Sequence, residues 1–219
     1  MAKRPKNSET VLMERYRVSL ENAENQPEIA TIMAELGYNA EKITEGKNLL
    51  AQTRSVYDLN KTEDDETSAA YAVFSSKKEA LAKIYKTHRK KAKVVFRDDS
   101  LTANKLAITG EMPGTYINWF EGVKKFYSLA TTDTDIQTKL SRLAITPESL
   151  AEANSLITAI EDARTVYLKE VGESQNATKA KDAAMAKMGY WMSEFYAVAR
   201  IGLEDKPQLL EALGITVKS

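Results

Sequence analysis

The sequence predicts an all-α protein made by tandem duplication of an antiparallel helical bundle, and three observations lead to this prediction. Apolar residues recur at spacings of three and four over long stretches, and no long stretch alternates as a strand would. The chain of 219 residues has only 9 glycines and 5 prolines, which gather near apparent helix ends. Residues in the first half also find equivalent residues 107 positions later, without a gap.

Each copy is expected to contain about four helices and a short closing helix. The helices of the first copy are expected near 10–24, 27–36, 40–61, 66–97 and 100–108. Those of the second copy are expected near 117–130, 134–143, 147–170, 175–203 and 206–213. Short connections between amphipathic helices favour antiparallel neighbours, so we expect two bundles related by a pseudo-twofold axis. A single merged eight-helix domain is the alternative.

The joints between the expected helices carry matching signals in the two copies. In "RLAITPESL", Thr146 is a good N-cap residue and Pro147 suits the first position of a helix. In "ELGYNAEKI", Gly37 is a helix stop and Asn39 is the cap. The phrase "LAIT" occurs twice and "LGIT" once, ending at Thr109, Thr146 and Thr216. We interpret these phrases as helix ends that serve as packing corners.

The duplicated register also sets the expected domain boundaries. Residues 10–109 form the first predicted bundle and residues 117–216 the second. The linker, 110–116, overlaps "TGEMPGT" at 109–115, where two glycines flank a proline. Residues 1–9 are basic and polar, and we expect a disordered tail there.

Four acids gather in "KTEDDET" at 61–67, between the third and fourth expected helices. Carboxylates are the ligands of hard cations, but the spacing of an EF-hand loop is absent. Acids are also favourable at the start of a helix, where they face the positive end of its dipole. We therefore attribute these four acids to a helix start.

The residue inventory excludes several chemistries. The chain has no cysteine, so thiol nucleophiles, disulfides and thiolate metal sites are absent. Its one histidine, His88, is too few for a catalytic triad, a histidine-rich zinc site or a di-iron bundle, and we expect it to fill a partly buried position with one hydrogen bond. No glycine-rich phosphate loop occurs. We assign no catalytic residue, metal ligand or cofactor, and this favours a non-enzymatic protein without excluding an enzyme.

One helix face between residues 83 and 97 is strongly basic. Its candidate anion-binding residues are Lys83, Lys86, Arg89, Lys90, Lys93 and Arg97. Their spacing of three and four places most of them on one side of a helix. The whole chain has 31 basic and 31 acidic residues, so any electrostatic attraction to a partner must be local. Residues 1–109 carry a charge of +3 and residues 110–219 a charge of −3.

Four aromatic side chains are candidates for an interface or a pocket. They are Trp119, Phe120, Tyr190 and Trp191. Aromatic residues are enriched in interfaces, but those on the apolar stripe of a helix usually belong to a core. The sequence leaves both roles open.

The segment "YWMSEFYAVARIGLEDKPQLLEALGI" at 190–215 resembles the C-terminal part of an uncharacterised group of bacterial all-helical proteins. In that group a tryptophan-bearing helix runs into an "AR-x-A-L"-like stretch and then "PQLLE-x-LG". The chain departs from the pattern at Gly202, where the group has alanine. The resemblance covers about the last quarter of the chain. It implies a bacterial source and a helical fold, and it transfers no activity.

We therefore expect a non-enzymatic interaction or scaffold protein of the bacterial cytoplasm. A protein partner or self-association is expected, since the opposite charges of the two halves suit head-to-tail or antiparallel association. Polyanion or nucleic-acid binding through the 83–97 face is the first alternative, and a small-molecule or carboxylate–metal site between helices is the weaker one. No membrane contact is expected, because no apolar run approaches the roughly 18 residues of a spanning helix.

Overall fold

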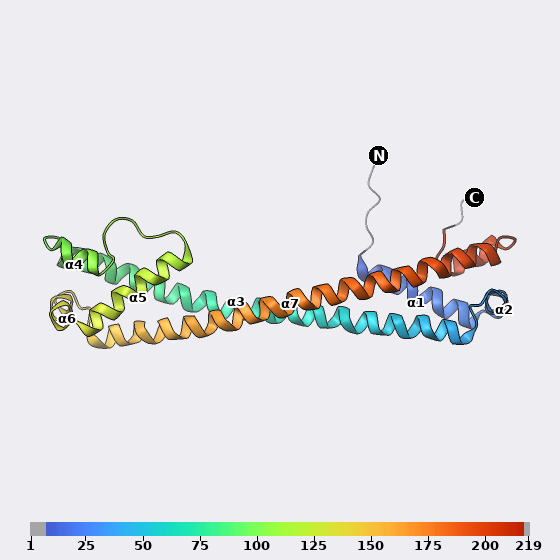
Figure 1. Cartoon of the computed structure of the whole chain (residues 1–219), viewed down its shortest axis with the longest axis horizontal. Coiled ribbons are helices and arrows are strands. Elements are labelled where there is room, and N and C mark those ends of the chain that lie inside the picture. Colours follow the sequence, from blue (N-terminus) through green and yellow to red (C-terminus); the bar gives the residue numbers. More distant parts are fainter. Residues whose placement is uncertain (1–7, 217–219) are drawn as a thin grey trace, which may run out of the picture. The chain divides into compact units, whose positions relative to one another are not determined.

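The computed structural model describes residues 8–216, and within this range the chain forms helices and turns without a strand (Figure 1). The all-α prediction is confirmed. The helices of the described residues are α1 (Glu9–Asn25), α2 (Pro27–Glu35), α3 (Ala40–Val95), α4 (Ser100–Lys105), α5 (Tyr116–Thr132), α6 (Thr134–Ser141), α7 (Pro147–Gly202) and α8 (Pro207–Ala212). Of the tail expected to be disordered, 1–9, residues 1–7 lie outside the described residues, whereas Ser8 caps α1 and Glu9 begins it.

Two of the predicted helix breaks are wrong, because α3 and α7 are each one continuous helix of 56 residues. The predicted helices that merge are 40–61 with 66–97, and 147–170 with 175–203. The acidic run at 61–67 therefore lies inside α3, and its attribution to a helix start is wrong. Glutamate is a good helix former and neither glycine nor proline interrupts the run, so the helix continues through it.

Within residues 8–216, each half of the sequence has four helices, one fewer than predicted, and their lengths correspond. Helices α1 and α5 both have 17 residues, α3 and α7 both have 56, and α4 and α8 both have 6. Helix α2 has 9 residues and α6 has 8. Each helix of the second half begins 107 residues after its counterpart in the first half.

The joints before α3 and α7 form as the sequence predicts. The Asn39 side chain accepts a hydrogen bond from the backbone N–H of Lys42 at 3.0 Å. Thr146 accepts one from the backbone N–H of Ser149 at 3.3 Å, and α7 then begins at Pro147. The apolar residues that flank the two caps are all buried, namely Tyr38, Ile43, Ile145 and Leu150. Each pair thus fixes the angle at which its helix begins, as a hydrophobic staple does.

The three repeated phrases are helix ends, as predicted, and each turns through a residue with a positive φ angle, namely Ala107 at 54°, Ala144 at 56° and Gly214 at 69°. The helix stop before α3 turns in the same way at Gly37, whose φ is 89°. The next residue then donates its N–H back across the last helical turn, as Ile145 does to the Leu140 carbonyl at 3.3 Å. The four donating residues, Tyr38, Ile108, Ile145 and Ile215, are buried. Each helix stop therefore inserts one apolar side chain into a core.

The chain divides into two compact units, and each unit combines segments from both halves of the sequence. Unit 1 holds residues up to Asp64 and from Glu173 onward, and unit 2 holds Asp65–Gly172. Unit 1 thus contains α1, α2, α8, the first part of α3 and the last part of α7 (Figure 1). Unit 2 contains α4, α5, α6 and the remaining parts of α3 and α7.

In unit 1, α3 runs antiparallel to α7 and α1 packs against both. Thr53 lies beside Ala184, with its hydroxyl 3.5 Å from the Ala184 carbonyl, and Asn60 donates to Thr178 at 3.1 Å. The main side chains of this core are Leu20, Ile29, Met33, Trp191, Met192, Phe195 and Leu203. Their burial removes apolar surface from water, which is the main stabilising contribution to the unit.

Unit 2 repeats this arrangement with α5 in the place of α1. Thr67 of α3 donates to the Glu170 carbonyl of α7 at 3.1 Å, and Asn154 of α7 donates to Thr131 of α5 at 3.0 Å. Its core is rich in aromatic residues, which include Phe74, Tyr85, Phe96, Trp119, Phe120, Phe126 and Tyr127.

The compact units differ from the predicted bundles 10–109 and 117–216, because each unit draws on both. The physical reason is the continuity of α3 and α7. A continuous helix cannot fold back on itself, so the two parts of α3 pack against different parts of α7 and against different short helices. The predicted linker, 110–116, accordingly lies within unit 2, where it joins α4 to α5.

Candidate functional site

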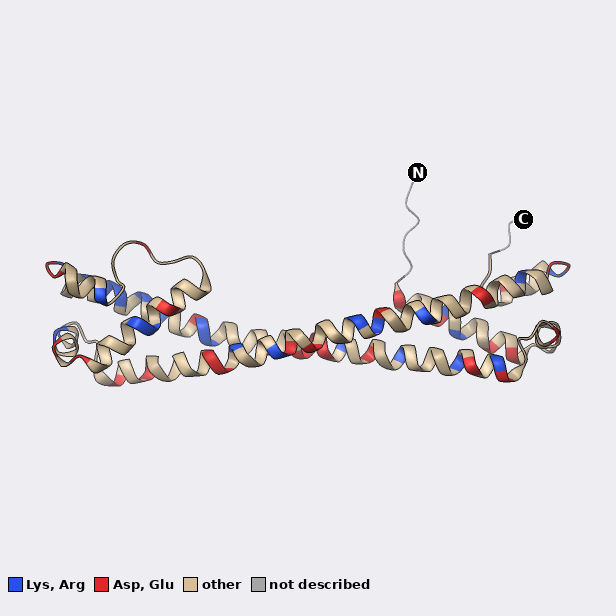
Figure 2. Ribbon diagram, in the orientation of Figure 1, with Lys and Arg blue, Asp and Glu red and all other residues tan. Residues whose placement is uncertain are grey.

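Five of the six candidate anion-binding residues line the outer face of α3 in unit 2. Lys83, Lys86, Lys90, Lys93 and Arg97 are all exposed, and basic residues gather on this part of α3 in Figure 2. The buried residues of the same segment are Leu81, Tyr85, His88, Ala92 and Phe96. The five cations, called the basic stripe from here on, thus face away from the core of unit 2.

The sixth residue, Arg89, does not belong to the basic stripe. It is 8% exposed, and its Nη2 donates to the carbonyls of Thr109 and Gly110 at 3.0 and 3.1 Å. Lys93 Nζ donates to the same Gly110 carbonyl at 2.9 Å. Arg89 and Lys93 therefore hold the loop that follows α4 against α3.

The remaining cations of the stripe differ in their partners. Arg97 forms an ion pair with Asp98 at 3.0 Å, in which both side chains are mostly exposed. Lys83, Lys86 and Lys90 have no carboxylate partner among the described residues. No carboxylate therefore contacts these three ammonium groups, and an anionic partner can reach them.

Three of the four candidate interface aromatics are core residues. Trp119, Phe120 and Trp191 are 7%, 5% and 8% exposed. Tyr190 is 77% exposed on α7 and is the one whose ring faces solvent. It lies beside Trp191 on a groove of about 570 Å³ between α3 and α7 in unit 1.

His88 is buried, more fully than the partly buried position that the sequence predicts, and it makes one hydrogen bond. Its Nδ1 lies 3.0 Å from the hydroxyl of Tyr127, and both side chains are buried. Burial lowers the pKa of His88, and the charge of Lys91 lowers it further, whereas Glu152 opposes this shift. Burial raises the pKa of Tyr127. The histidine is therefore held in its neutral form, which suits a packing role.

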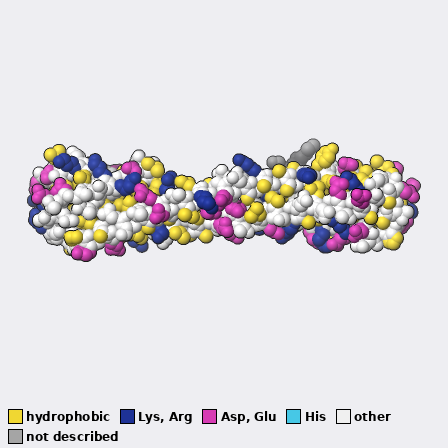
Figure 3. All heavy atoms as spheres, turned by 60° about the horizontal axis from the view of Figure 1, so that its bottom comes forward, with side chains coloured by type: hydrophobic (Ala, Val, Ile, Leu, Met, Phe, Trp, Pro, Cys, Tyr) yellow, Lys and Arg dark blue, Asp and Glu magenta, His cyan; other side chains and the backbone are white. Residues whose placement is uncertain are grey.

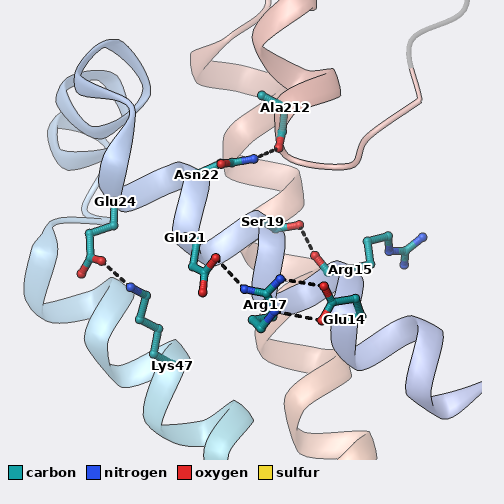
Figure 4. A network of polar contacts seen from close by, with 9 residues as sticks. All are labelled: Glu14, Arg15, Arg17, Ser19, Glu21, Asn22, Glu24, Lys47 and Ala212. Atoms are coloured by element: carbon teal, nitrogen blue, oxygen red, sulfur yellow. Dashed lines mark hydrogen bonds and ion pairs between the residues drawn. The ribbon is translucent and has the colours of Figure 1, made fainter.

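Unit 1 has a polar network along α1 (Figure 4). On one side of the helix, Ser19 and Asn22 donate to the carbonyls of Leu213 and Ala212 at 2.7 and 2.6 Å. On the exposed side, Arg17 pairs with Glu14 and Glu21, both at 2.7 Å. These contacts tie the turn after α8 to α1 and leave no unbalanced charge on Arg17.

The described residues also form grooves large enough for a small molecule. One of about 500 Å³ lies between α1 and α3, over Met13, Leu20 and Leu50. Its charged rim is paired internally, since Arg54 pairs with Asp58 and Lys47 with Glu24. The groove thus combines an apolar floor with charged side chains that pair with one another.

Comparison with known proteins gives no relative. No family model, no curated protein and no solved structure matches the chain. No helix in the part of the chain that the structure describes combines the length and hydrophobicity needed to cross a bilayer. The resemblance of residues 190–215 to a bacterial group stays a prediction, and any function must be argued from the surfaces themselves.

Proposed function

We propose that this chain is a non-enzymatic interaction protein, a scaffold whose two units arose by duplication of one helical segment. The correspondence of helix lengths supports the duplication, and so does the burial pattern. Core residues recur 107 positions apart, as Ile29 with Ile136, Ala92 with Ala199, and Leu106 with Leu213. Members of each of these pairs are buried. A repeat that conserves both helix ends and buried positions is typical of duplicated architectures.

The observation that favours a scaffold is that the exposed residues of the two units differ although their buried residues correspond. Lys83 and Lys90 on α3 have the uncharged equivalents Tyr190 and Ala197 on α7, and all four are exposed or partly exposed. Exposed residues can change without loss of stability, so two units with one kind of core present two different outer faces. Two different faces on one chain can hold two different partners.

The proposal is tested by capturing partners with the chain in its native host after cross-linking, and then rebuilding each complex from purified components. A variant that alters the outer face of unit 2, Lys83→Glu with Lys86→Glu, should release one partner. Tyr190→Ser, which alters the outer face of unit 1, should release another. Both variants should retain the helical content of the parent in circular dichroism. A chain that captures nothing that can be rebuilt in vitro would count against the scaffold.

A second candidate function is polyanion binding through the basic stripe. The observation that favours it is the row of exposed cations Lys83, Lys86 and Lys90, which have no carboxylate partner among the described residues. Cations along one helix face displace the counterions of a phosphate backbone, and the resulting affinity falls steeply with salt. No exposed aromatic residue lies within the stripe, so we expect attraction to the backbone without base recognition.

Fluorescence anisotropy with a labelled single strand and a labelled duplex tests this candidate. Reversing Lys83, Lys86 and Lys90 to glutamate should abolish binding at low salt. The matched control reverses Lys61, Lys179 and Lys187, which are exposed residues of unit 1, and it should bind as the parent does. Equal losses in both triple variants would indicate a general effect of net charge and would rule the stripe out as a site.

A further inference from the structure

Each unit has a charged surface at one of its ends. The two surfaces occupy equivalent positions in the two units and carry opposite charges. In unit 1 this surface, called the acidic end, contains the exposed residues Glu35, Leu36, Ile201 and Glu204. In unit 2 the equivalent surface, called the basic end, contains Arg142, Leu143, Val94 and Arg97. Each residue of one set lies 107 positions from its equivalent in the other. The two surfaces therefore occupy corresponding positions at the ends of corresponding helices and differ in their charged groups.

The residues of the acidic end come from two helices that pack closely together. The end of α7 packs on α2 so closely that a Cβ on Gly202 would lie 2.6 Å from Cδ1 of Leu36 and 3.0 Å from Cγ2 of Ile32. Ile201 is the neighbour of Gly202, and Glu204 follows in the turn after α7. The close approach thus brings Leu36 and Ile201 to the same end of unit 1.

Two contacts join the residues of the basic end in the same way. Lys91 Nζ lies 3.5 Å from the carbonyl of Ala144, which follows Leu143. Lys139 Nζ lies 5.9 Å above the ring of Phe96, which precedes Arg97. These contacts hold the end of α3 against α6, so Val94 and Leu143 lie at the same end of unit 2.

Each end exposes two apolar side chains among its charged ones. Ile201 and Leu36 are 69% and 42% exposed, and Val94 and Leu143 are 62% and 36% exposed. Hydrophobic side chains reach the surface between charged ones over the molecule (Figure 3), but these two pairs occupy equivalent positions. Apolar residues ringed by charge are typical of docking surfaces.

The charges around the two apolar pairs are complementary and available. Glu35, Glu204 and Arg142 form no ion pair among the described residues. Arg97 pairs with Asp98, but the two side chains are 77% and 85% exposed, and an ion pair so exposed to water is weak. Asp98 has the equivalent Asp205 at the acidic end, so this acid does not distinguish the two surfaces.

From this complementarity we infer that the acidic end of one copy of the chain docks onto the basic end of a second copy. Ile201 and Leu36 then cover Val94 and Leu143, while Glu35 and Glu204 meet Arg142 and Arg97. Pairing of two identical ends would place like charges opposite one another, which is unfavourable. The contact is therefore head-to-tail, and because it leaves one end free on each copy, the assembly extends by adding further copies. This inference rests on the proposed scaffold function, for which it supplies one partner, the chain itself.

Sedimentation of the purified full chain at low salt tests the inference through charge reversal. The parent should increase in mass with concentration. The variant Arg97→Glu with Arg142→Glu has two acidic ends, and the variant Glu35→Arg with Glu204→Arg has two basic ends. Each alone should associate about tenfold more weakly or not at all. A mixture of the two variants should regain the mass of the parent, and so should the single chain that carries all four substitutions.

The control reverses two lysines of the same helix that lie outside the basic end. Lys83→Glu with Lys86→Glu changes the net charge as much as Arg97→Glu with Arg142→Glu does, and it should leave the assembly unchanged. Ile201→Ser removes apolar surface without changing charge, and it should weaken the assembly at every salt concentration. Retention of helical content in each variant excludes unfolding as the cause of any loss.

Two results would overturn the inference, and both can be told apart from failure of the scaffold proposal. A parent chain that remains a monomer at all concentrations in low salt, or two charge variants that fail to restore one another in a mixture, would eliminate head-to-tail docking. The scaffold proposal survives either result if the cross-linking experiment still yields different partners for the two outer faces. The scaffold fails instead when no partner is captured, whatever the mass of the purified chain.

Discussion

At Gly37, Ala107, Ala144 and Gly214, one residue with a positive φ angle ends a helix. In this left-handed region of positive φ, a residue other than glycine is less stable by about 1–2 kcal/mol, because its Cβ approaches the backbone carbonyl. Glycine avoids this cost but loses about 0.5–1 kcal/mol more conformational entropy on folding. The chain therefore uses both kinds of residue for the same turn, and Ala107 and Ala144 retain strain that glycine would relieve.

Exchanging the residue types at two equivalent stops should change stability in opposite directions. Ala144→Gly should raise the free energy of unfolding by up to about 1 kcal/mol, since strain is removed. Gly37→Ala should lower it by about 1 kcal/mol, and no atom lies within 4 Å of the added Cβ, so the loss reports the backbone alone. Urea denaturation followed by circular dichroism measures both. A loss of stability in Ala144→Gly would contradict the assignment of strain.

Stability should fall in mild acid because His88 is buried in its neutral form. Its pKa is lowered in the folded chain from the ordinary value of 6.5, so the unfolded chain binds the proton first as pH falls. Above about pH 6.5 the histidine is neutral in both states and has no effect. Between about pH 6.5 and the lowered pKa of the folded state, the free energy of unfolding should decrease with decreasing pH.

The pH dependence is measured by denaturation of the parent and of His88→Phe, since the equivalent residue Phe195 is a fully buried ring. The variant leaves the Tyr127 hydroxyl without its partner, which should cost about 1–3 kcal/mol at all pH values. The decrease between pH 6.5 and 5.5 should become smaller in the variant. An identical decrease in both proteins would assign the acid sensitivity to other groups.

At the scale of the element, Gly46 allows the Trp191 ring of α7 to pack directly against α3 in unit 1. A Cβ on Gly46 of α3 would lie 2.5 to 2.8 Å from three ring atoms of Trp191 on α7. The indole also donates to Glu45 at 3.3 Å and meets the edge of Tyr38 at a ring separation of 5.5 Å. The ring is thus held from several sides and cannot move away from an added methyl group.

Two glycine-to-alanine changes in the long helices should therefore have opposite effects. Gly46→Ala should lower the free energy of unfolding by about 1–3 kcal/mol, because the overpacked methyl outweighs the gain in helix propensity. Gly172→Ala in α7 meets no atom within 4 Å and should raise it by about 1 kcal/mol. Thermal denaturation measures both. Adding Trp191→Ile to Gly46→Ala, which imitates the equivalent residues Ala153 and Ile84, should recover part of the loss.

At the scale of the whole molecule, each core needs both halves of the sequence. In unit 1, Ile29 and Met33 from the first half share a core with Met192 and Phe195 from the second. The buried apolar area is the main source of stability. Each half of the sequence has one long helix, and a separated half lacks the long helix that packs along it.

The halves 1–109 and 110–219, expressed separately, should therefore fold poorly as monomers. Mixed in equal amounts, they should form a one-to-one complex and regain the helical content of the whole chain, because each supplies what the other lacks. Circular dichroism and sedimentation of the halves and of the mixture measure this. Two halves that each unfold cooperatively as stable monomers would contradict the division into units.

Local chemistry made several features predictable from the sequence. The period of the apolar residues gave the fold class, the cap residues Asn39 and Thr146 gave the helix starts, and the "LAIT" phrases gave the helix stops. Each of these signals acts within a few residues of the chain. The exposed positions of Lys83, Lys86 and Lys90 also follow from the same period, since the apolar stripe must face inward.

Long-range packing decided the rest, because it depends on residues far apart in the chain. The acidic run contains neither glycine nor proline, but acids also suit the start of a helix, so local signals alone did not decide that α3 continues through it. This continuity makes the two parts of α3 pack in different units. The burial of Arg89 depends on carbonyls of the loop after α4. The two charged ends depend on contacts between helices that are far apart in the sequence, α2 with α7 and α3 with α6. The sequence by itself thus determined the helices and their apolar faces, whereas the tertiary structure decided which helices share a core and which charges meet solvent.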